Sequence, residues 1–338
     1  MADQAGEQTG GAKPPFDDQP EKAASQPPEL RAPLAPFAGE PPPAPAWFDK
    51  ALAHAPERAM VPTPRGRIET LSWGERGKPG LLFLHGNTAH ADWWSFIAPM
   101  FADDYRVCAM SLAGMGDSDW RDRYSSDDFA ADAEDVAQAS GLYEGGRKPV
   151  YIGHSFGGGQ VFYAAACRPE QMHAAIIIDV GFRGPPEDEA SKAQLQRLDP
   201  PPPARGPTRV YPTLAEALAR FRLSPAQPAE NLYIVDLLAR RGLKPVEGGW
   251  TWKFDPQMWE KLDRQLIAAF FAAPPRIDLP LAHIYGELSL LQSVPGLQDA
   301  YPANGLLVGV PEAHHHVMVD QPLALISAIR GLLAAWRA

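Results

Sequence analysis

The sequence predicts an α/β fold in which a doubly wound, mostly parallel sheet carries an inserted, mainly helical segment. Short apolar runs alternate with segments of helical periodicity, and this alternation stops near residue 181 and resumes near residue 278. Alternating strands and helices of these lengths are typical of a parallel sheet with helices on both faces. A serine between two glycines, at a junction of strand and helix, adds a candidate reactive residue to that sheet.

The expected core occupies residues 46–180 and 278–338. Residues 67–73 alternate apolar and polar side chains, as in a strand with one solvated face, whereas residues 80–85 are continuously apolar, as in a strand covered on both faces. Further strands are expected directly before Ser155 and at 105–112, 174–179, 280–285 and 305–310. Helices are expected at 91–101, 127–140, 158–167 and 322–336.

Residues 181–277 interrupt this alternation. Proline-rich stretches separate three segments of helical periodicity, at 214–222, 229–241 and 260–271, and residues 248–255 alternate aromatic side chains with others. The simplest interpretation is a mainly helical cap inserted into the sheet. An independent binding domain is the alternative, because a segment of roughly 95 residues is long enough to fold alone.

Residues 1–45 differ from the rest of the chain in composition. They are rich in proline, glutamine, alanine and acidic residues and show no apolar period. Such a segment buries too little apolar surface to offset the entropy lost on ordering. We therefore expect a disordered, proline-rich tail that ends at residue 45.

The charge balance restricts the partners. The chain of 338 residues has 31 Lys and Arg against 41 Asp and Glu, a net charge of -10, and shows no basic patch. Nucleic acid and anionic membranes are therefore not expected as partners. The N-terminus lacks the basic start and apolar stretch of a signal peptide, and no run is long enough to span a membrane, so we expect a cytoplasmic protein. The sequence does not indicate an oligomeric state.

Ser155 is the candidate nucleophile. It follows a short apolar run, precedes a helical segment and stands in the pattern Gly153-x-Ser155-x-Gly157. A nucleophile elbow needs this spacing, because the serine lies in a strained turn and side chains two positions away on either side would clash with the crossing backbone.

A serine hydroxyl requires a nearby base, and the base requires an acid that orients it. Three consecutive histidines, His314, His315 and His316, follow the last expected strand and supply candidates for the base. Three consecutive residues seldom bind one ion, so no metal site is expected. For the acid we favour Glu287, just past a strand, over Asp179, at the end of the strand that follows the elbow.

The anion formed on attack at a carbonyl requires two N–H donors. The backbone N–H of Phe156, directly after the nucleophile, is one candidate. The other is the N–H of Asn87, in a turn that Gly86 permits after an apolar strand.

Four motifs resemble those of the serine α/β-hydrolase superfamily with a helical cap, over about residues 60–338. In chain order they are His85-Gly-Asn87, Gly114-Met-Gly-Asp-Ser118, Gly153-His-Ser-Phe-Gly157 and residues 313–322. The resemblance implies the α/β-hydrolase fold. It also implies that His315 is the base, because the histidine of the family precedes a proline by seven residues, here Pro322. His314 stands where the family usually has glycine and is the second choice.

The resemblance leaves the acid open. Family members most often place an aspartate two or three residues after the glycine at position 286, where this chain has Leu288 and Ser289. Glu287 is therefore inferred in its place, and Asp179 remains the alternative because some relatives use that strand end.

The expected activity is that of a serine hydrolase that cleaves a carboxylic ester or lactone of a small, partly apolar substrate, without a cofactor. Hydrolysis of a carbon–carbon bond in a diketone, with the same triad, is one alternative, and a non-catalytic ligand receptor on the same fold is another. The His-Gly-Asn motif is also similar to that of dehalogenases and epoxide hydrolases. Those enzymes use an aspartate nucleophile, and Ser155 disfavours their chemistry.

Overall fold

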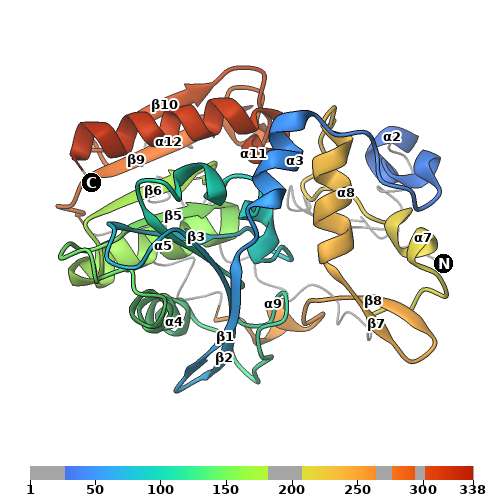
Figure 1. Ribbon diagram of the computed structural model, residues 1–338, viewed down its shortest axis with the longest axis horizontal. Coiled ribbons are helices and arrows are strands. Elements are labelled where there is room, and N and C mark those ends of the chain that lie inside the picture. The colour runs from blue at the N-terminus through green and yellow to red at the C-terminus, as the bar shows by residue number, and fades with distance from the viewer. Residues whose placement is uncertain (1–26, 182–207, 264–275, 294–300, 338) are drawn as a thin grey trace, which may run out of the picture.

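The computed structural model describes residues 27–181, 208–263, 276–293 and 301–337 (Figure 1). Its centre is an eight-stranded sheet in the order β1-β2-β4-β3-β5-β6-β9-β10. The strands are β1 (Glu57–Thr63), β2 (Gly66–Trp73), β3 (Gly80–Leu84), β4 (Arg106–Met110), β5 (Val150–His154), β6 (Ala174–Ile178), β9 (Leu281–Gly286) and β10 (Leu306–Val310). Only the pairs β1·β2 and β2·β4 among these are antiparallel. The predicted mostly parallel sheet is confirmed.

The central strands are buried on both faces, as their continuous apolar runs predict. All five residues of β3 are buried, and β3 pairs in parallel with β4 on one side and β5 on the other. Because successive side chains of a strand point to opposite faces, Leu81 and Phe83 enter one apolar cluster, whereas Leu82 and Leu84 enter another. The sheet therefore separates two cores.

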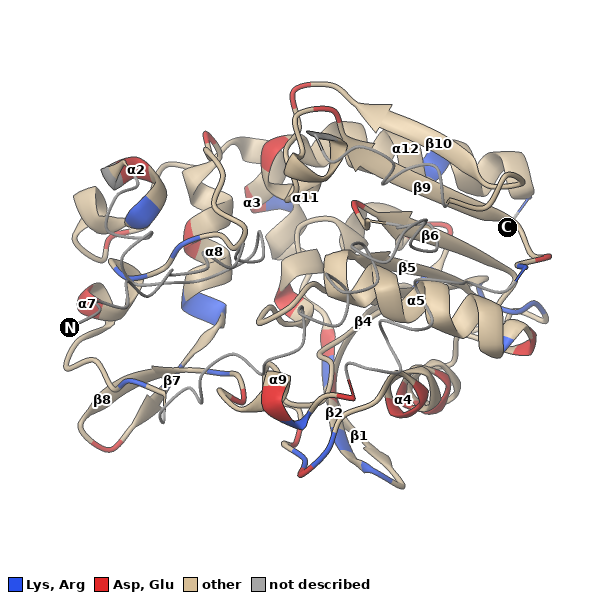
Figure 2. Ribbon diagram, turned by 180° about the vertical axis from the view of Figure 1, so that it is seen from behind, with Lys and Arg blue, Asp and Glu red and all other residues tan. Residues whose placement is uncertain are grey.

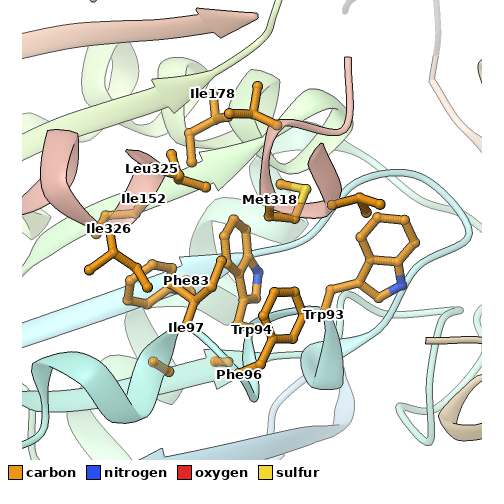
Figure 3. Packing of buried hydrophobic residues seen from close by; sticks show 14 of the residues in the cluster. Phe83, Trp93, Trp94, Phe96, Ile97, Ile152, Ile178, Met318, Leu325 and Ile326 are labelled. Carbon is orange, nitrogen blue, oxygen red and sulfur yellow. The ribbon is translucent and has the colours of Figure 1, made fainter. Parts of the chain in front are cut away.

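Helices cover both faces. On one face, α4 (Ser126–Ala139) and α5 (Ser155–Cys167) pack with the cluster of Leu82, and on the other, α3 (Ala46–Ala53) and α12 (Pro322–Trp336) pack with that of Phe83. Figure 3 shows Leu325 and Ile326 of α12 beside Phe83 and Ile97. The shorter helices of the core are η2 (Ala91–Trp94), η3 (Ala98–Phe101), η4 (Pro169–Gln171), η5 (Leu290–Ser293) and α11 (Val317–Asp320).

The helix expected at 91–101 is wrong in detail. The structure has two separate 3-10 turns, η2 and η3, with Pro99 in the second. Proline has no N–H to continue an α-helical ladder, which favours the break. The apolar side chains still face the core: Trp94 is fully buried, with its ring 5.0 Å from that of Phe83.

The described part of the insertion, residues 208–263, is here named the cap segment. It contains α7 (Leu214–Leu218), α8 (Leu232–Arg241), α9 (Met258–Lys261) and a hairpin of β7 (Leu243–Val246) and β8 (Gly249–Trp252). The expected mainly helical insertion does not include this hairpin. The aromatic alternation at 248–255 belongs to its strand β8. Most of the helix expected at 260–271 lies outside the described residues, as do residues 182–207.

The cap segment packs on the core. Ile234 and Leu238 of α8 belong to the same buried cluster as Phe48 of α3. Polar contacts reinforce the junction: a ring nitrogen of His90 lies 3.0 Å from the carbonyl oxygen of Leu238. In Figure 1, α8 lies beside α3, and the hairpin extends away from the sheet.

The expectation of a disordered tail up to residue 45 is wrong for residues 27–45. This segment forms α2 (Pro28–Arg31) and η1 (Ala35–Phe37), and Leu34 is only 2% exposed. Arg240 of α8 donates a hydrogen bond to the carbonyl of Gly39. Apolar side chains at Leu34 and Phe37, although without period, pack in the same cluster as the cap segment. Residues 1–26 of the expected tail lie outside the described residues.

Acidic residues gather on α4 (Figure 2). Asp132 of this helix is fully buried and lies 2.9 Å from Nε of Arg65 and 2.8 Å from Nη2 of Arg121. Burial raises the pKa of Asp132, and the two arginines oppose that shift.

None of the helices within the described ranges has the length and apolar character needed to cross a bilayer.

The buried N-terminal segment yields a prediction. Leu34→Ala should lower the free energy of unfolding by about 2–5 kcal/mol, because it removes a buried side chain and leaves a cavity. Leu323→Ala is the control, since Leu323 is 49% exposed, and it should change stability by less than about 0.5 kcal/mol. Denaturant unfolding measures both, and equal effects would show that the segment does not pack in solution.

Candidate active site

Ser155 lies at the sharp turn between β5 and α5. Its φ of +50° is in the left-handed region, which is costly for a residue with a side chain. A Cβ atom on Gly153 would lie 2.4 Å from the carbonyl oxygen of Gly157, and one on Gly157 would lie 2.3 Å from that of His85. The turn therefore requires glycine at both positions, as the spacing predicts.

His315 connects Ser155 to a carboxylate. Its Nε2 is 2.9 Å from Oγ of Ser155, and its Nδ1 is 2.7 Å from Oδ2 of Asp179. A carboxylate accepts hydrogen bonds, so Nδ1 donates to Asp179 and Nε2 is left to accept the hydroxyl hydrogen of Ser155. The three side chains form one continuous chain of hydrogen bonds.

The structure places Asp179, and not Glu287, at His315. Asp179 follows β6 with φ +48° and is fully buried. Its Oδ1 accepts the N–H of Gly286 at 3.1 Å, and its Oδ2 accepts the hydroxyl of Ser289 at 2.6 Å. Glu287 is exposed and its backbone N–H donates to Val310 at the edge strand β10. The expectation that Glu287 orients the histidine is therefore wrong in geometry, because its exposed side chain lies beside Gly309 of β10 and Asp179 occupies the position at His315.

The other histidine considered as a base is held elsewhere. Nδ1 of His314 lies 3.0 Å from Oδ2 of Asp320, and the same oxygen accepts the backbone N–H of His314 at 2.7 Å. Its side chain is 30% exposed. The structure therefore brings His315 to Ser155 and turns His314 away.

Gln227 of the cap segment binds the loop between β10 and α11, residues 311–316, which is called the histidine loop below. Oε1 of Gln227 accepts the backbone N–H of His316 at 2.8 Å, and its Nε2 lies 3.0 Å from each carboxylate oxygen of Asp320. Asn231 adds bonds to the carbonyls of Val319 and Asp320. Burial raises the pKa of Asp320, and the bonds from His314 and Gln227 oppose the shift. Nothing in the local sequence around Gln227 indicates this role, since the contact spans 89 residues.

The two candidate N–H donors lie on either side of Ser155. Phe156 is the second residue of α5, and the first N–H groups of a helix have no acceptor within it. The loop of Gly86 and Asn87 approaches from β3: a Cβ on Gly86 would lie 3.4 Å from Cβ of Ser155. The side-chain oxygen of Asn87 is buried and makes no hydrogen bond.

His85 fixes this loop as a neutral ring. Its Nε2 accepts the N–H of Leu112 at 2.9 Å, so Nδ1 carries the proton and donates to the carbonyl of Gly86 at 2.7 Å. Burial lowers the pKa of His85 to about 3. The ring therefore stays uncharged at neutral pH and holds the backbone that leads to Asn87.

Aromatic side chains surround the reactive residues. The ring of Phe156 lies 5.7 Å from that of Trp259 in α9, and Trp93 stacks on His154 with ring centroids 6.5 Å apart. Trp94 belongs to the buried core instead. Trp250 and Trp252 of the insertion lie on β8, whereas its Phe270 and Phe271 lie outside the described residues.

Three histidines form a group that could hold a metal ion. His154, His315 and His316 are all buried, and one ring nitrogen of each lies within 4.8 Å of those of the other two. Burial lowers the pKa of His154 and of His316 well below the usual range, and the neighbouring His315 adds to both shifts. The three consecutive histidines 314–316 alone are not expected to bind one ion. The structure instead combines two of them with His154, which precedes the nucleophile.

Comparisons with known proteins agree with this architecture. The model of the alpha/beta hydrolase fold family matches residues 79–225. Epoxide hydrolase 4 of Mus musculus is 35% identical over 116 residues, which are 33% of this chain and 31% of that protein. The chain thus spans about a third of the length of that relative. The 2-(acetamidomethylene)succinate hydrolase of Mesorhizobium japonicum is 27% identical over 276 residues, 80% of this chain and 93% of that protein.

Solved structures extend the likeness over most of the chain. A thioesterase domain from the curacin biosynthetic pathway has a TM-score of 0.63 and 25% identity, over 82% of this chain and 99% of that chain. E-2-(acetamidomethylene)succinate hydrolase has a TM-score of 0.63 and 21% identity, over 82% of this chain and 98% of that chain. With the family match and the sheet order, these likenesses agree in an α/β-hydrolase fold and support an enzyme of hydrolase type.

The contact between the cap segment and the histidine loop yields a prediction. Gln227→Leu leaves the buried N–H of His316 without its acceptor and removes one donor from the carboxylate of Asp320, so the free energy of unfolding should fall by about 2–4 kcal/mol. Gln257→Leu is the control, because Gln257 is an exposed glutamine of the same segment. Thermal and denaturant unfolding measure both variants, and an unchanged stability for Gln227→Leu would contradict the contact.

Proposed function

We propose that this protein is a serine hydrolase that cleaves a carboxylic ester or lactone of a small, partly apolar substrate. The observation that carries the proposal is the continuous chain of hydrogen bonds from Asp179 through His315 to Ser155, with distances of 2.7 and 2.9 Å. Such a chain supplies what a serine nucleophile lacks, a base within reach and an acid that fixes the orientation of the base.

The reaction follows from the positions of the protons. Ser155 Oγ attacks the carbonyl carbon while Nε2 of His315 takes the hydroxyl proton, and Asp179 stabilises the imidazolium through Nδ1. His315 then gives the proton to the leaving alcohol oxygen, and an acyl group remains on Ser155. A water molecule, deprotonated by His315, attacks the acyl carbon, and His315 then returns the proton to Oγ of Ser155 as the ester bond breaks, which releases the acid and the free serine.

The backbone N–H groups of Phe156 and Asn87 are the proposed donors to the anionic oxygen. They lie on the two sides of the nucleophile, one at the start of α5 and the other in the loop after β3. Loss of one such donor typically costs about 3–4 kcal/mol of transition-state stabilisation. Because both donors are backbone groups, the conformation of the glycine-containing turns determines their placement.

The substrate class follows from the nucleophile and its surroundings. An oxygen nucleophile with a neutral base suits acyl transfer, and the likeness to a thioesterase domain supports the same type of chemistry. Trp93, Phe156 and Trp259 lie around the reactive residues, and aromatic rings there favour an apolar acyl or alcohol group.

The test of the nucleophile is labelling with a fluorophosphonate, which phosphonylates an activated serine. We expect a single modification at Ser155, and no labelling of the Ser155→Ala protein. Peptide mapping by mass spectrometry locates the modified residue. Labelling of another residue, or the absence of labelling in a folded protein, would overturn the proposal.

The bond that is cleaved needs a separate comparison. The three residues also serve the hydrolysis of a carbon–carbon bond in a diketone, so aryl esters, lactones and a ring-fission diketone are assayed in parallel. Turnover of the esters or lactones by the wild-type protein but not by Ser155→Ala supports the proposal. Turnover of the diketone alone would replace it with the alternative.

The position of the acid yields a further prediction. Asp179→Asn should lower kcat by about 10³–10⁴-fold, because the amide cannot stabilise the charged imidazole and favours the wrong tautomer of His315. Glu287→Gln is the matched control, since Glu287 is exposed, and its kcat should stay within about twofold of the wild-type value. Steady-state kinetics on the best ester decides between them, and the reverse result would return the role to Glu287.

A further inference from the structure

The three buried histidines around Ser155 come from two parts of the chain. His154 is the last residue of β5, and His315 and His316 lie between β10 and α11. Their ring centroids are 4.9 Å apart for His154 and His315, 4.9 Å for His315 and His316, and 5.4 Å for His154 and His316. The exposed fractions are 1%, 6% and 4%, in chain order.

Two of these rings have nitrogens that lack a hydrogen bond of normal geometry. Nδ1 of His154 is buried without such a partner; the ring nitrogens of His316 also lack one, although the backbone of Ser224 and Pro225 lies close to this ring. A buried polar atom without a partner costs free energy, on the order of 1–3 kcal/mol. The cluster therefore presents imidazole nitrogens that a ligand would satisfy, directly beside the nucleophile.

We propose that His154, His315 and His316 form a binding site for a divalent transition metal ion such as Zn²⁺, and that the bound ion inhibits the enzyme. Imidazole nitrogens are preferred ligands of Zn²⁺, and three of them leave a fourth position for water. Ligand nitrogens about 2.0–2.1 Å from one ion lie about 3.4 Å apart in tetrahedral geometry. The three nitrogens lie within 4.8 Å of one another, so the rings must move closer together to complete the site.

The partners of two of the rings fit this role. A histidine that binds a metal usually donates its other N–H to a carboxylate or a backbone carbonyl. Nδ1 of His315 donates to Asp179, and Nε2 of His154 lies 2.9 Å from the carbonyl oxygen of His315. The contacts that hold these two rings in place therefore also orient them for a metal.

Inhibition rests on the proposed function, because it depends on the role of His315 as the base. Nε2 of His315 cannot coordinate an ion and accept the hydroxyl hydrogen of Ser155 at the same time. When the ion binds, the serine keeps its proton and loses its acceptor. Ser155 and Phe156 are only partly buried, which gives an ion a route to this side of the ring.

The binding test uses the full-length Ser155→Ala protein, which has no activity to interpret. We expect one Co²⁺ ion per chain with the intense visible absorption of tetrahedral coordination, and displacement of Co²⁺ by Zn²⁺. His316→Leu in the same background should weaken binding at least about 100-fold. His314→Leu is the matched control from the same histidine triplet, and it should leave the affinity within about threefold. His316→Phe keeps a ring in the pocket if the leucine variant does not fold.

Activity provides the second arm. Zn²⁺ should inhibit ester hydrolysis by the otherwise wild-type protein, and EDTA should restore the rate. His316→Leu and His316→Phe, each compared with its own metal-free rate, should require at least about 100-fold more Zn²⁺ for half-inhibition. Absence of stoichiometric Co²⁺ binding, or equal effects of the His314 and His316 variants, would overturn the metal site. Binding without any detectable hydrolysis would instead contradict the proposed function and leave the site supported.

Discussion

The hydrogen bond between Asp179 and His315 is the interaction on which the site depends. A fully buried carboxylate is expensive unless donors surround it, and Asp179 has three: the N–H of Gly286, the hydroxyl of Ser289 and Nδ1 of His315. These donors come from the end of β9, the turn after it and the loop after β10. Satisfying one carboxylate therefore requires β6 and β9 to end side by side and the histidine loop to fold back over them.

The sequence contains the nucleophile in a form that can be recognised, because the elbow is a local structure. Gly153, Ser155 and Gly157 lie within one turn, and a Cβ on Gly153 would clash with the backbone of Gly157, although one on Gly157 would clash with His85 at the end of β3. The acid is different. Asp179 and His315 are 136 residues apart in sequence, and their contact depends on the pairing of β6 with β9 across the insertion. A pattern of residue types near position 287 carries no information about that pairing, which explains why the sequence alone favours Glu287.

Composition and periodicity also fail to predict some segments outside the sheet. The apolar runs predict the strands well, because a strand that is buried on both faces has apolar side chains at successive positions. The segment at 27–45 has no such run, and it is ordered by contacts with a distant helix, among them the bond from Arg240 to Gly39. The hairpin of β7 and β8 is hard to predict for a related reason, since a short solvated strand among prolines and helices leaves only a weak alternation of aromatic residues.

The side-chain amide of Gln227 has a consequence for exchange of the cap segment between relatives. Its oxygen accepts a hydrogen bond from the backbone N–H of His316, and its nitrogen donates one to the carboxylate of Asp320. This position therefore needs a side chain with both an acceptor and a donor, in that orientation. A transplanted insertion that alters the substrate pocket must bring an equivalent donor and acceptor to this point. Chimaeras that keep residues 224–231 with the core, and exchange only the part of the cap segment after residue 231, should preserve the geometry of the histidine loop.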